Sequence, residues 1–347
     1  MKKILALVLS VFLLAACGQK EEKEVLRVFN WGEFIDESQI TAFEKEYNAK
    51  VIYERYASNE QMYQKLFDGS KYDILVPSDY MIERLVEEER LQKLDFDKIP
   101  NYTGVFDFLK NTGMDYMTDY SVPYFWGNVG ILFHKDRVDM ADLEAKGWDI
   151  FKDPKYKGRF YFYDSERDAF MVALKALGYS ANTNDSQEIK EAYYWLEEMM
   201  ETMDPVFGTD EIVDNMGSEI KDFAVVYSGD ASLAMLDYDF LSYYVPDNTN
   251  KWIDGMVIPK DAPNPELAHK WIDFMLREDV AKANSEEIAY ASPVESVVKE
   301  LTKPKGMFAN NPAYIVRFDE KNDEFFKHDE KLKKIMSEYW AKIKAFR

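Results

Sequence analysis

The chain has 347 residues, of which 47% are hydrophobic, and a formal net charge of −21. We expect two domains, because a single domain usually holds roughly 100–200 residues. The hydrophobic content argues against extensive disorder. The acidic balance argues against a nucleic-acid partner, whose phosphates require a basic surface, and most of these charges are expected to keep the protein soluble.

The N-terminus has the features of an export signal. The letters MKK supply positive charge, and residues 4–14 form an apolar run that is short for a membrane span. The run ends at LAAC, where Cys17 is the only cysteine of the chain. This pattern resembles the lipobox of bacterial lipoproteins, which implies a signal peptide over 1–16, a lipid on Cys17 and a polar tether over 17–24. A signal sequence without a lipobox is the alternative. We expect a lipid-anchored protein at the cell surface or in the periplasm.

From residue 25 onward, apolar strands alternate with amphipathic helices. Strands are predicted over 25–31, 49–56 and 72–80, and helices over 36–48, 58–70 and 81–94. Alternation of this kind predicts a parallel sheet that is covered by helices on both faces. Ligands of such sheets bind outside the carboxyl ends of the strands. Trp31 and Ser78 both lie at those ends.

A second α/β region follows a strand predicted over 120–136, and another strand over 251–259 is expected to cross back. We therefore expect two lobes that are joined by more than one crossing segment. The expected boundaries are 25–131 plus 253–310 for lobe 1, and 132–252 plus 311–347 for lobe 2. The chain closes with a charged helix within 322–346.

Several kinds of chemistry lack their sequence signals. There is no glycine-rich phosphate loop, and the three histidines stand in unrelated contexts without metal-ligand spacing. We therefore expect no metal, no cofactor and no enzymatic activity. Two carboxylates could form a glycosidase pair, but with 64 acidic residues such a pair arises easily by chance. An exported hydrolase therefore stays as a weak alternative.

Aromatic residues stand beside acids at the expected strand ends. The groups are Trp31, Glu33 and Phe34; Asp79 and Tyr80; Asp168 and Phe170; Tyr227 and Asp230; Trp252 and Asp254. Rings can cover methylene groups, and each cation–π contact contributes roughly 0.5–2 kcal/mol. A buried ammonium–carboxylate contact at about 4 Å gains about 4 kcal/mol at an effective dielectric near 20. Desolvation opposes that gain, so several acids are required. The pattern predicts a site for an elongated ammonium compound.

Stretches along nearly the whole mature chain resemble the polyamine-binding components of ABC importers. They include FNWGEFID, YASNEQMYQKL, YDILVPSDYMIERL, YSVPYFWGNVGI, RDAFMVALKALGYSANT and WIDGMVIPKDAPNPELAHKWIDFMLRED. The resemblance implies a type II fold like that of periplasmic binding proteins, with a mostly parallel sheet flanked by helices in each of two α/β lobes. The ligand then lies in the cleft between the lobes, which close on it. It also implies a polyamine ligand, permease partners and a monomeric protein.

We expect twelve residues at the ligand; the resemblance implies eleven of them, and Asp79 is an extra acid that the spermidine type often lacks. They are Trp31, Glu33, Phe34, Ser78, Asp79, Tyr80, Asp168, Tyr227, Asp230, Trp252, Asp254 and Tyr290. Phe34 stands where the family often has tyrosine. Ser165 replaces an acid of the spermidine type, with Asp164 and Glu166 beside it as substitutes. The choice between putrescine and spermidine stays open, and a binding protein for another organic cation is the second alternative.

Overall fold

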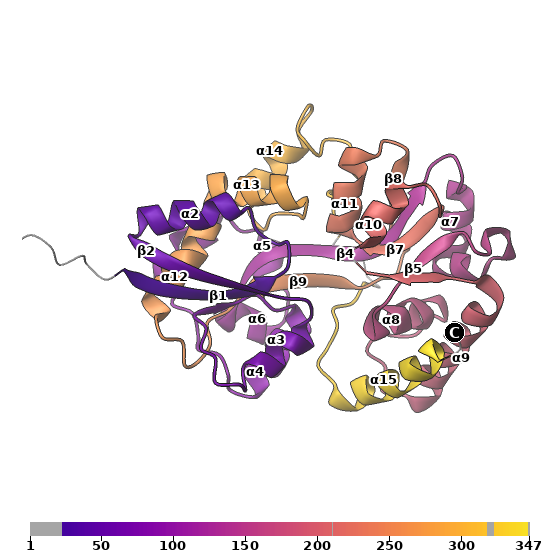
Figure 1. Cartoon of the computed structure of the whole chain (residues 1–347), viewed down its shortest axis with the longest axis horizontal. Coiled ribbons are helices and arrows are strands. Elements are labelled where there is room, and N and C mark those ends of the chain that lie inside the picture. The colour runs from indigo at the N-terminus through magenta and orange to yellow at the C-terminus, as the bar shows by residue number, and fades with distance from the viewer. Residues whose placement is uncertain (1–22, 210, 318–322, 346–347) are drawn as a thin grey trace, which may run out of the picture.

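The computed structural model describes residues 23–209, 211–317 and 323–345. Two α/β lobes lie side by side along the long axis of the molecule, and strands β4 (Val122–His134) and β9 (Lys251–Met256) run between them (Figure 1). This architecture confirms the two lobes and the two crossing strands predicted from the sequence. The predicted signal peptide and Cys17 lie outside the described residues.

The first lobe contains a parallel sheet. Its strands are β1 (Glu24–Trp31), β2 (Ala49–Tyr56) and β3 (Ile74–Leu75), in the order β2-β1-β3. The third strand is shorter than predicted because the chain after it pairs with β9 instead. Leu75 and Val257 exchange backbone hydrogen bonds of 3.0 and 2.9 Å, and Gly255 donates to the carbonyl of Pro77 at 3.0 Å.

The second lobe contains a mixed sheet of order β6-β5-β7-β4-β8. Its other strands are β5 (Phe160–Tyr163), β6 (Val206–Gly208), β7 (Phe223–Tyr227) and β8 (Leu241–Tyr244). The predicted parallel pairing holds for β5 with β6 and β7. The long strand β4 adds antiparallel pairs: residues 122–128 pair with β9, and residues 129–134 pair with β7 and β8.

Helices surround both sheets (Figure 1). In the first lobe they are α2 (Glu37–Glu46), α3 (Asn59–Lys65), α4 (Asp79–Glu87), α5 (Asp107–Lys110), α6 (Asp115–Tyr120), α12 (Pro265–Met275), α13 (Glu278–Ile288) and α14 (Glu295–Thr302). In the second lobe they are α7 (Met140–Lys146), α8 (Glu166–Ala176), α9 (Ser186–Met203), α10 (Glu211–Gly217), α11 (Ser228–Asp237) and α15 (Glu330–Lys344). Short 3-10 turns cover Phe96–Lys98, Pro100–Gly104, Gly147–Lys152 and Pro154–Tyr156.

Two of the predicted helices begin at a capping side chain. The Asp36 side chain accepts from the backbone N–H of Ser38 at the start of α2, and Ser58 Oγ accepts from the N–H of Gln61 at 3.1 Å at the start of α3. Such caps satisfy N–H groups that have no partner within the helix. They also fix where the chain leaves β1 and β2, the two strands whose ends approach the second lobe.

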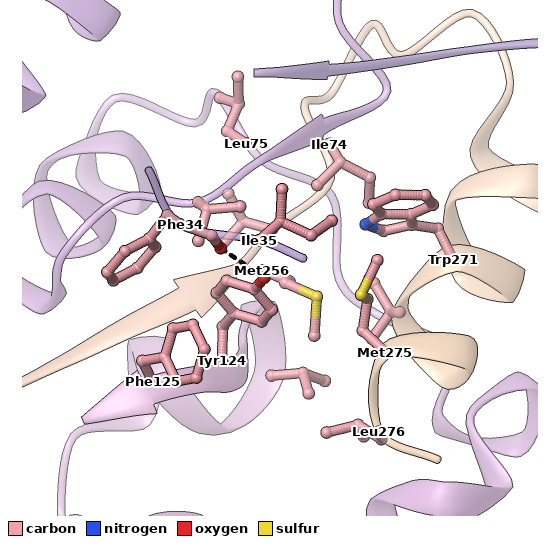
Figure 2. Close-up of a cluster of buried hydrophobic side chains, with 14 of the residues drawn as sticks. Phe34, Ile35, Ile74, Leu75, Tyr124, Phe125, Met256, Trp271, Met275 and Leu276 are labelled. Carbon is pink, nitrogen blue, oxygen red and sulfur yellow. Dashed lines mark hydrogen bonds between the residues drawn. The ribbon is translucent and has the colours of Figure 1, made fainter. Parts of the chain in front are cut away.

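The hydrophobic core divides along strand β4. Trp126 belongs to the core cluster of the first lobe and Val129 to that of the second. In the first core, Phe34 lies beside Tyr124 and Phe125, and Tyr124 Oη donates to the carbonyl of Phe34 at 2.7 Å (Figure 2). The loop after β1 is thus held by core packing, which positions the residues on either side of Phe34.

Candidate ligand-binding site

Aromatic residues occupy the carboxyl ends of four parallel strands. Trp31 ends β1, Tyr56 ends β2, Tyr163 ends β5 and Tyr227 ends β7. Strands β1 and β2 belong to the first lobe, and strands β5 and β7 to the second. Strand-end rings from both lobes therefore face the region where the lobes meet, as the rule for ligand sites on parallel sheets predicts.

The rings form one continuous series of contacts, here called the aromatic wall. Its centroid separations are 5.2 Å for Tyr163–Tyr227, 6.0 Å for Tyr227–Trp252, 5.5 Å for Trp252–Tyr290, 5.3 Å for Tyr290–Phe34 and 6.4 Å for Phe34–Trp31. These separations lie in the range of favourable edge-on and tilted contacts. The structure thus brings together five predicted rings, Trp31, Phe34, Tyr227, Trp252 and Tyr290, whereas the predicted Tyr80 contacts Phe326 instead.

Two glycines make room for the wall. A Cβ atom on Gly229 would lie 1.9 Å from Cδ2 of Tyr290, and one on Gly127 would lie 2.6 Å from Cζ2 of Trp252. No real Cβ atom tolerates such distances, so a larger residue at either position would displace the ring. Both positions require glycine, because the backbone lies close to an aromatic ring there, at the junction of the lobes.

Asp168 is a buried carboxylate with a free oxygen. Its side chain is 4% exposed, Oδ2 accepts from Tyr227 Oη at 3.0 Å, and Oδ1 has no partner among the described residues. Burial raises the pKa of Asp168, while the hydrogen bond from Tyr227 opposes that rise. A buried acceptor without a donor is costly. Asp168 is therefore poised to accept from a cationic group.

Asp254 is the corresponding carboxylate of the first lobe. Its Oδ1 accepts a 2.6 Å hydrogen bond from Ser78 Oγ, and the residue is 5% exposed. Burial raises the pKa of Asp254 to about 8, Ser78 opposes that rise, and the negative charge of Asp79 adds to it. Within residues 23–209, 211–317 and 323–345, neither Asp254 nor Asp168 forms an ion pair with lysine, arginine or histidine.

Two other predicted acids, Asp79 and Asp230, accept hydrogen bonds from groups of the protein itself. Asp79 accepts from the backbone N–H of Ile253 at 3.0 Å and from that of Tyr80 at 2.6 Å, one with each oxygen. Burial raises its pKa to about 7. Asp79 therefore holds β9 against the start of α4. Asp230 accepts from Tyr290 Oη at 2.8 Å, which fixes a ring of the aromatic wall.

Glu33 does not join this group. Its side chain is exposed in the described structure, although Trp31 and Phe34 on either side belong to the aromatic wall. The two acids beside Ser165 are also used elsewhere. Asp164 pairs with Lys344 at 2.5 Å, and Glu166 accepts from the hydroxyl of Ser337 at 2.9 Å.

The ring of Tyr80, at the edge of the site, stacks against the guanidinium group of Arg167. The guanidinium carbon of Arg167 stands 4.0 Å from the centroid of the Tyr80 ring and 5.1 Å from that of Phe326. Arg167 follows β5 in the second lobe, whereas Tyr80 belongs to α4 in the first. This stacking contact therefore connects the two lobes beside Asp168.

The indole N–H of Trp252 is buried and has no partner among the described residues. An N–H group only donates, so it cannot bond to an ammonium group. What Trp252 can offer a cation is the face of its ring. The described part of the chain contains no group of three or more His, Cys, Asp or Glu residues that could hold a metal ion. It also contains no helix with the length and apolar character needed to cross a membrane.

Three further residues at the candidate site were not predicted from the sequence: Tyr56, Tyr163 and Asn59. Tyr56 contacts Trp31 at a centroid distance of 4.8 Å, and Tyr163 contacts Tyr227. Tyr56 ends a predicted strand, so the strand-end rule would have found it, whereas Tyr163 ends β5, whose bounds were not predicted. No sequence signal marks Asn59, which lies near the start of the helix predicted over 58–70.

Two α/β lobes that meet at a ring-lined, acidic junction define a solute-binding protein of the periplasmic type. The chain belongs to the family described as bacterial extracellular solute-binding protein, whose profile matches residues 38–314. The family resemblance inferred from the sequence is thereby confirmed.

Relatives of known name agree with this assignment. The spermidine/putrescine-binding periplasmic protein of Escherichia coli is 33% identical over 96% of this chain and 95% of its own length. The putrescine/cadaverine-binding protein of Pseudomonas aeruginosa is 30% identical over 84% of this chain and 85% of its own.

Solved structures agree as well. The spermidine/putrescine ABC transporter substrate-binding protein PotD of Streptococcus pneumoniae superposes with a TM-score of 0.79 at 30% identity, covering 93% of this chain and 99% of its own. The PotD lipoprotein of Treponema pallidum gives a TM-score of 0.80 at 25% identity, with coverages of 92% and 99%.

Proposed function

We propose that this protein captures polyamines outside the cytoplasm and delivers them to an ABC importer. The observation that carries the proposal is a pair of buried carboxylates without ion-pair partners among the described residues: Asp168, which accepts from Tyr227 of the aromatic wall, and Asp254, which lies two residues after Trp252 of the same wall. A slender compound with an ammonium group at each end satisfies both acids, and the rings cover its methylene groups. The names of the relatives support the same ligand class.

We propose the following contacts with the ligand. Asp168 and Asp254 accept from the ammonium groups, and Trp252 and Tyr227 contribute ring faces. Trp31, Phe34 and Tyr290 continue the wall. Ser78 donates to Asp254, and Asp230 accepts from Tyr290. Asp79 holds β9 through the N–H of Ile253, and Tyr80 stacks with Arg167 at the edge of the site. Glu33 reaches the ligand only if its exposed side chain turns inward.

The proposed cellular setting rests on the N-terminal sequence. Cleavage after residue 16 and a lipid on Cys17 would anchor the protein to a bacterial membrane, with the lobes facing the permease. The lipoprotein of Treponema pallidum among the structural relatives supports that anchor. The proposed lobe boundaries remain 25–131 plus 253–310 and 132–252 plus 311–347, and the change of core cluster between Trp126 and Val129 supports them. A monomer without catalytic activity is the form we propose.

Isothermal titration of the mature protein with putrescine, spermidine and spermine tests the function. We expect saturable binding of at least one polyamine. A matched control is 4-aminobutyrate, which has the same carbon spacing as putrescine but carries a carboxylate at one end. It should bind far more weakly, because its carboxylate would meet a buried acid. Absence of heat and of a thermal shift with all three polyamines would refute the proposal.

Another organic cation is the second candidate. A quaternary amine can use the aromatic wall, but it has no N–H group to donate to Asp168 Oδ1 or Asp254. Choline in the same titration separates the two ligand classes. Tighter binding of choline than of every polyamine would favour the second candidate.

A further inference from the structure

The side chain of Asn59 forms hydrogen bonds to two hydroxyl groups of the site, those of Ser78 and Tyr80. Asn59 is the first residue of α3 and is 3% exposed. Its Nδ2 donates to Ser78 Oγ at 3.1 Å and to Tyr80 Oη at 3.0 Å. Its Oδ1 accepts from the backbone N–H of Ser78 at 3.2 Å. The amide thus uses both donor hydrogens and its acceptor on two neighbouring residues.

The orientation of this amide follows from chemistry. A backbone N–H can only donate, so the atom that faces the N–H of Ser78 must be the amide oxygen. The amide nitrogen must then face the hydroxyl groups of Ser78 and Tyr80. Both hydroxyl oxygens accept from Asn59, and each keeps its own proton for another partner. For Ser78 that partner is Asp254 Oδ1, at 2.6 Å.

The hydroxyl of Ser78 could cap helix α4 but does not. Ser78 is the N-cap residue of α4, yet its side chain makes no capping hydrogen bond. An N-cap serine normally accepts from an N–H of the first helical turn. Here the hydroxyl is turned toward Asn59 and Asp254 instead. The Asn59 amide and the Asp254 carboxylate together hold Ser78 in this non-capping direction.

We propose that Asn59 is a positioning residue of the binding site, whose amide makes the Ser78 hydroxyl donate to Asp254 and anchors the Tyr80 ring. The inference rests on the proposed polyamine-binding function. Through Ser78, Asn59 fixes the Asp254 carboxylate so that one oxygen is used and the other stays available to an ammonium group. Without the amide, Ser78 can rotate to cap α4, and Asp254 then loses its donor.

A double-mutant cycle tests this role. We expect Asn59→Ala to weaken the binding of the polyamine that the unmodified protein binds best by about threefold to tenfold, the range for one net hydrogen bond. In the background Ser78→Ala, Tyr80→Phe, the same substitution should change the affinity by less than about twofold, because the hydroxyl groups through which it acts are gone. The affinity of the Asn59→Ala variant should also reach its maximum at a higher pH, because Asp254 without the hydrogen bond from Ser78 keeps its proton to a higher pH.

Two further variants keep the test decisive. Gln61→Ala removes a hydrogen bond to the N–H of Ala57 at the start of the same helix, so it reports on α3 alone and should leave affinity unchanged. Asn59→Asp retains the size and the acceptor if the alanine variant does not fold. Its carboxylate cannot donate to Ser78 Oγ, so it competes with Asp254 for the Ser78 proton, and its effect on affinity should also shrink in the Ser78→Ala, Tyr80→Phe background.

The outcomes separate this inference from the proposed function. If the unmodified protein binds no polyamine, the function fails first. If it binds but Asn59→Ala binds equally well, the positioning role alone is overturned. An undiminished loss in the Ser78→Ala, Tyr80→Phe background would also overturn it, since Asn59 would then act by another route.

Discussion

Tyr227 donates from Oη to Oδ2 of Asp168 at 3.0 Å, and the other oxygen of that buried carboxylate has no partner in the described structure. We therefore expect Asp168→Asn to weaken polyamine binding by about 2–5 kcal/mol, the cost of removing one partner of a buried charge pair. The ligand-free variant should be no less stable, because an amide oxygen can still accept from Tyr227. Calorimetry and thermal unfolding measure the two effects.

The matched control for that change is Asp164→Asn. Asp164 lies four residues earlier but pairs with Lys344 at 2.5 Å at a partly exposed position. Its removal should alter affinity by less than about 0.5 kcal/mol. Equal losses in the two variants would show a general effect of acidic charge and would contradict the specific role of Asp168.

The strand-end rule explains why much of this site was predictable. The ends of parallel strands meet at one edge of a sheet, so Trp31 and Tyr227 could be placed at the junction of the lobes because each stands at a predicted strand end. The role of each acid could not be predicted from the sequence, because it depends on hydrogen bonds between segments that are distant in the chain. Asp79 accepts a hydrogen bond from the backbone N–H of Ile253, and Glu33 is exposed, although both acids stand beside aromatic residues in the sequence.

The antiparallel pairs of the second lobe were also beyond the sequence pattern. Strand β4 was predicted as a strand that leaves the first lobe, and it does so. Its two halves then pair with different partners, β9 in one half and β7 with β8 in the other. A hydrophobic run predicts a strand but does not specify the direction of its neighbours.

Polyamine affinity should rise with pH between about 6 and 8. Burial raises the pKa of Asp254 to about 8, so the ligand-free carboxyl is largely protonated at neutral pH, and a bound ammonium group favours the charged form. Binding then releases a proton, and affinity increases by up to about tenfold per pH unit until the carboxyl is ionised. Alkyl ammonium groups lose their protons only near pH ~10.

Titrations in buffers with different ionisation enthalpies count the released protons directly. Asp79, whose pKa is raised to about 7, also contributes to the profile. We expect Asp254→Asn to flatten the upper part of the pH dependence. An affinity that stays constant from pH 6 to 9 in the unmodified protein would contradict the coupling.

The ligand-free protein should lose stability as the pH rises through the same range. The folded pKa values of Asp79 and Asp254 are about 7 and about 8, above the usual 3.8, so the folded state holds protons that the unfolded chain releases. Their contribution is complete below pH ~4 and is lost as pH rises through the folded pKa values. The loss reaches about 1.4 kcal/mol per pH unit for each titrating carboxyl.

Urea unfolding between pH 5 and 9 measures this slope. The Asp254→Asn variant should show a shallower decline, because one of the two carboxyl groups no longer titrates. Saturating polyamine should stabilise the unmodified protein more at pH 8 than at pH 6, since ligand binding adds stability in proportion to the logarithm of its affinity. The reverse order would contradict the assignment.

Gly229→Ala should damage both packing and binding. The new Cβ would lie 1.9 Å from the Tyr290 ring, which must move away from Trp252 and from its hydrogen bond to Asp230. We expect a loss of about 1–3 kcal/mol in the free energy of unfolding, as is usual for overpacking. Gly104→Ala is the control, because its Cβ would make only an ordinary 3.7 Å contact. Retention of full affinity by Gly229→Ala would mean that the Tyr290 ring does not contribute to binding.

Glu33→Gln distinguishes the resemblance to relatives from the geometry of this chain. The family pattern places the acid between Trp31 and Phe34 at the ligand, whereas its side chain is exposed in the structure. An exposed carboxylate contributes little to the binding of a cation because water screens its charge. We therefore expect a change of less than about 0.5 kcal/mol in polyamine affinity, against several kcal/mol for Asp168→Asn. A loss as large as that of Asp168→Asn would show that the loop after β1 turns Glu33 inward on binding, and the aromatic wall would then close around three acids.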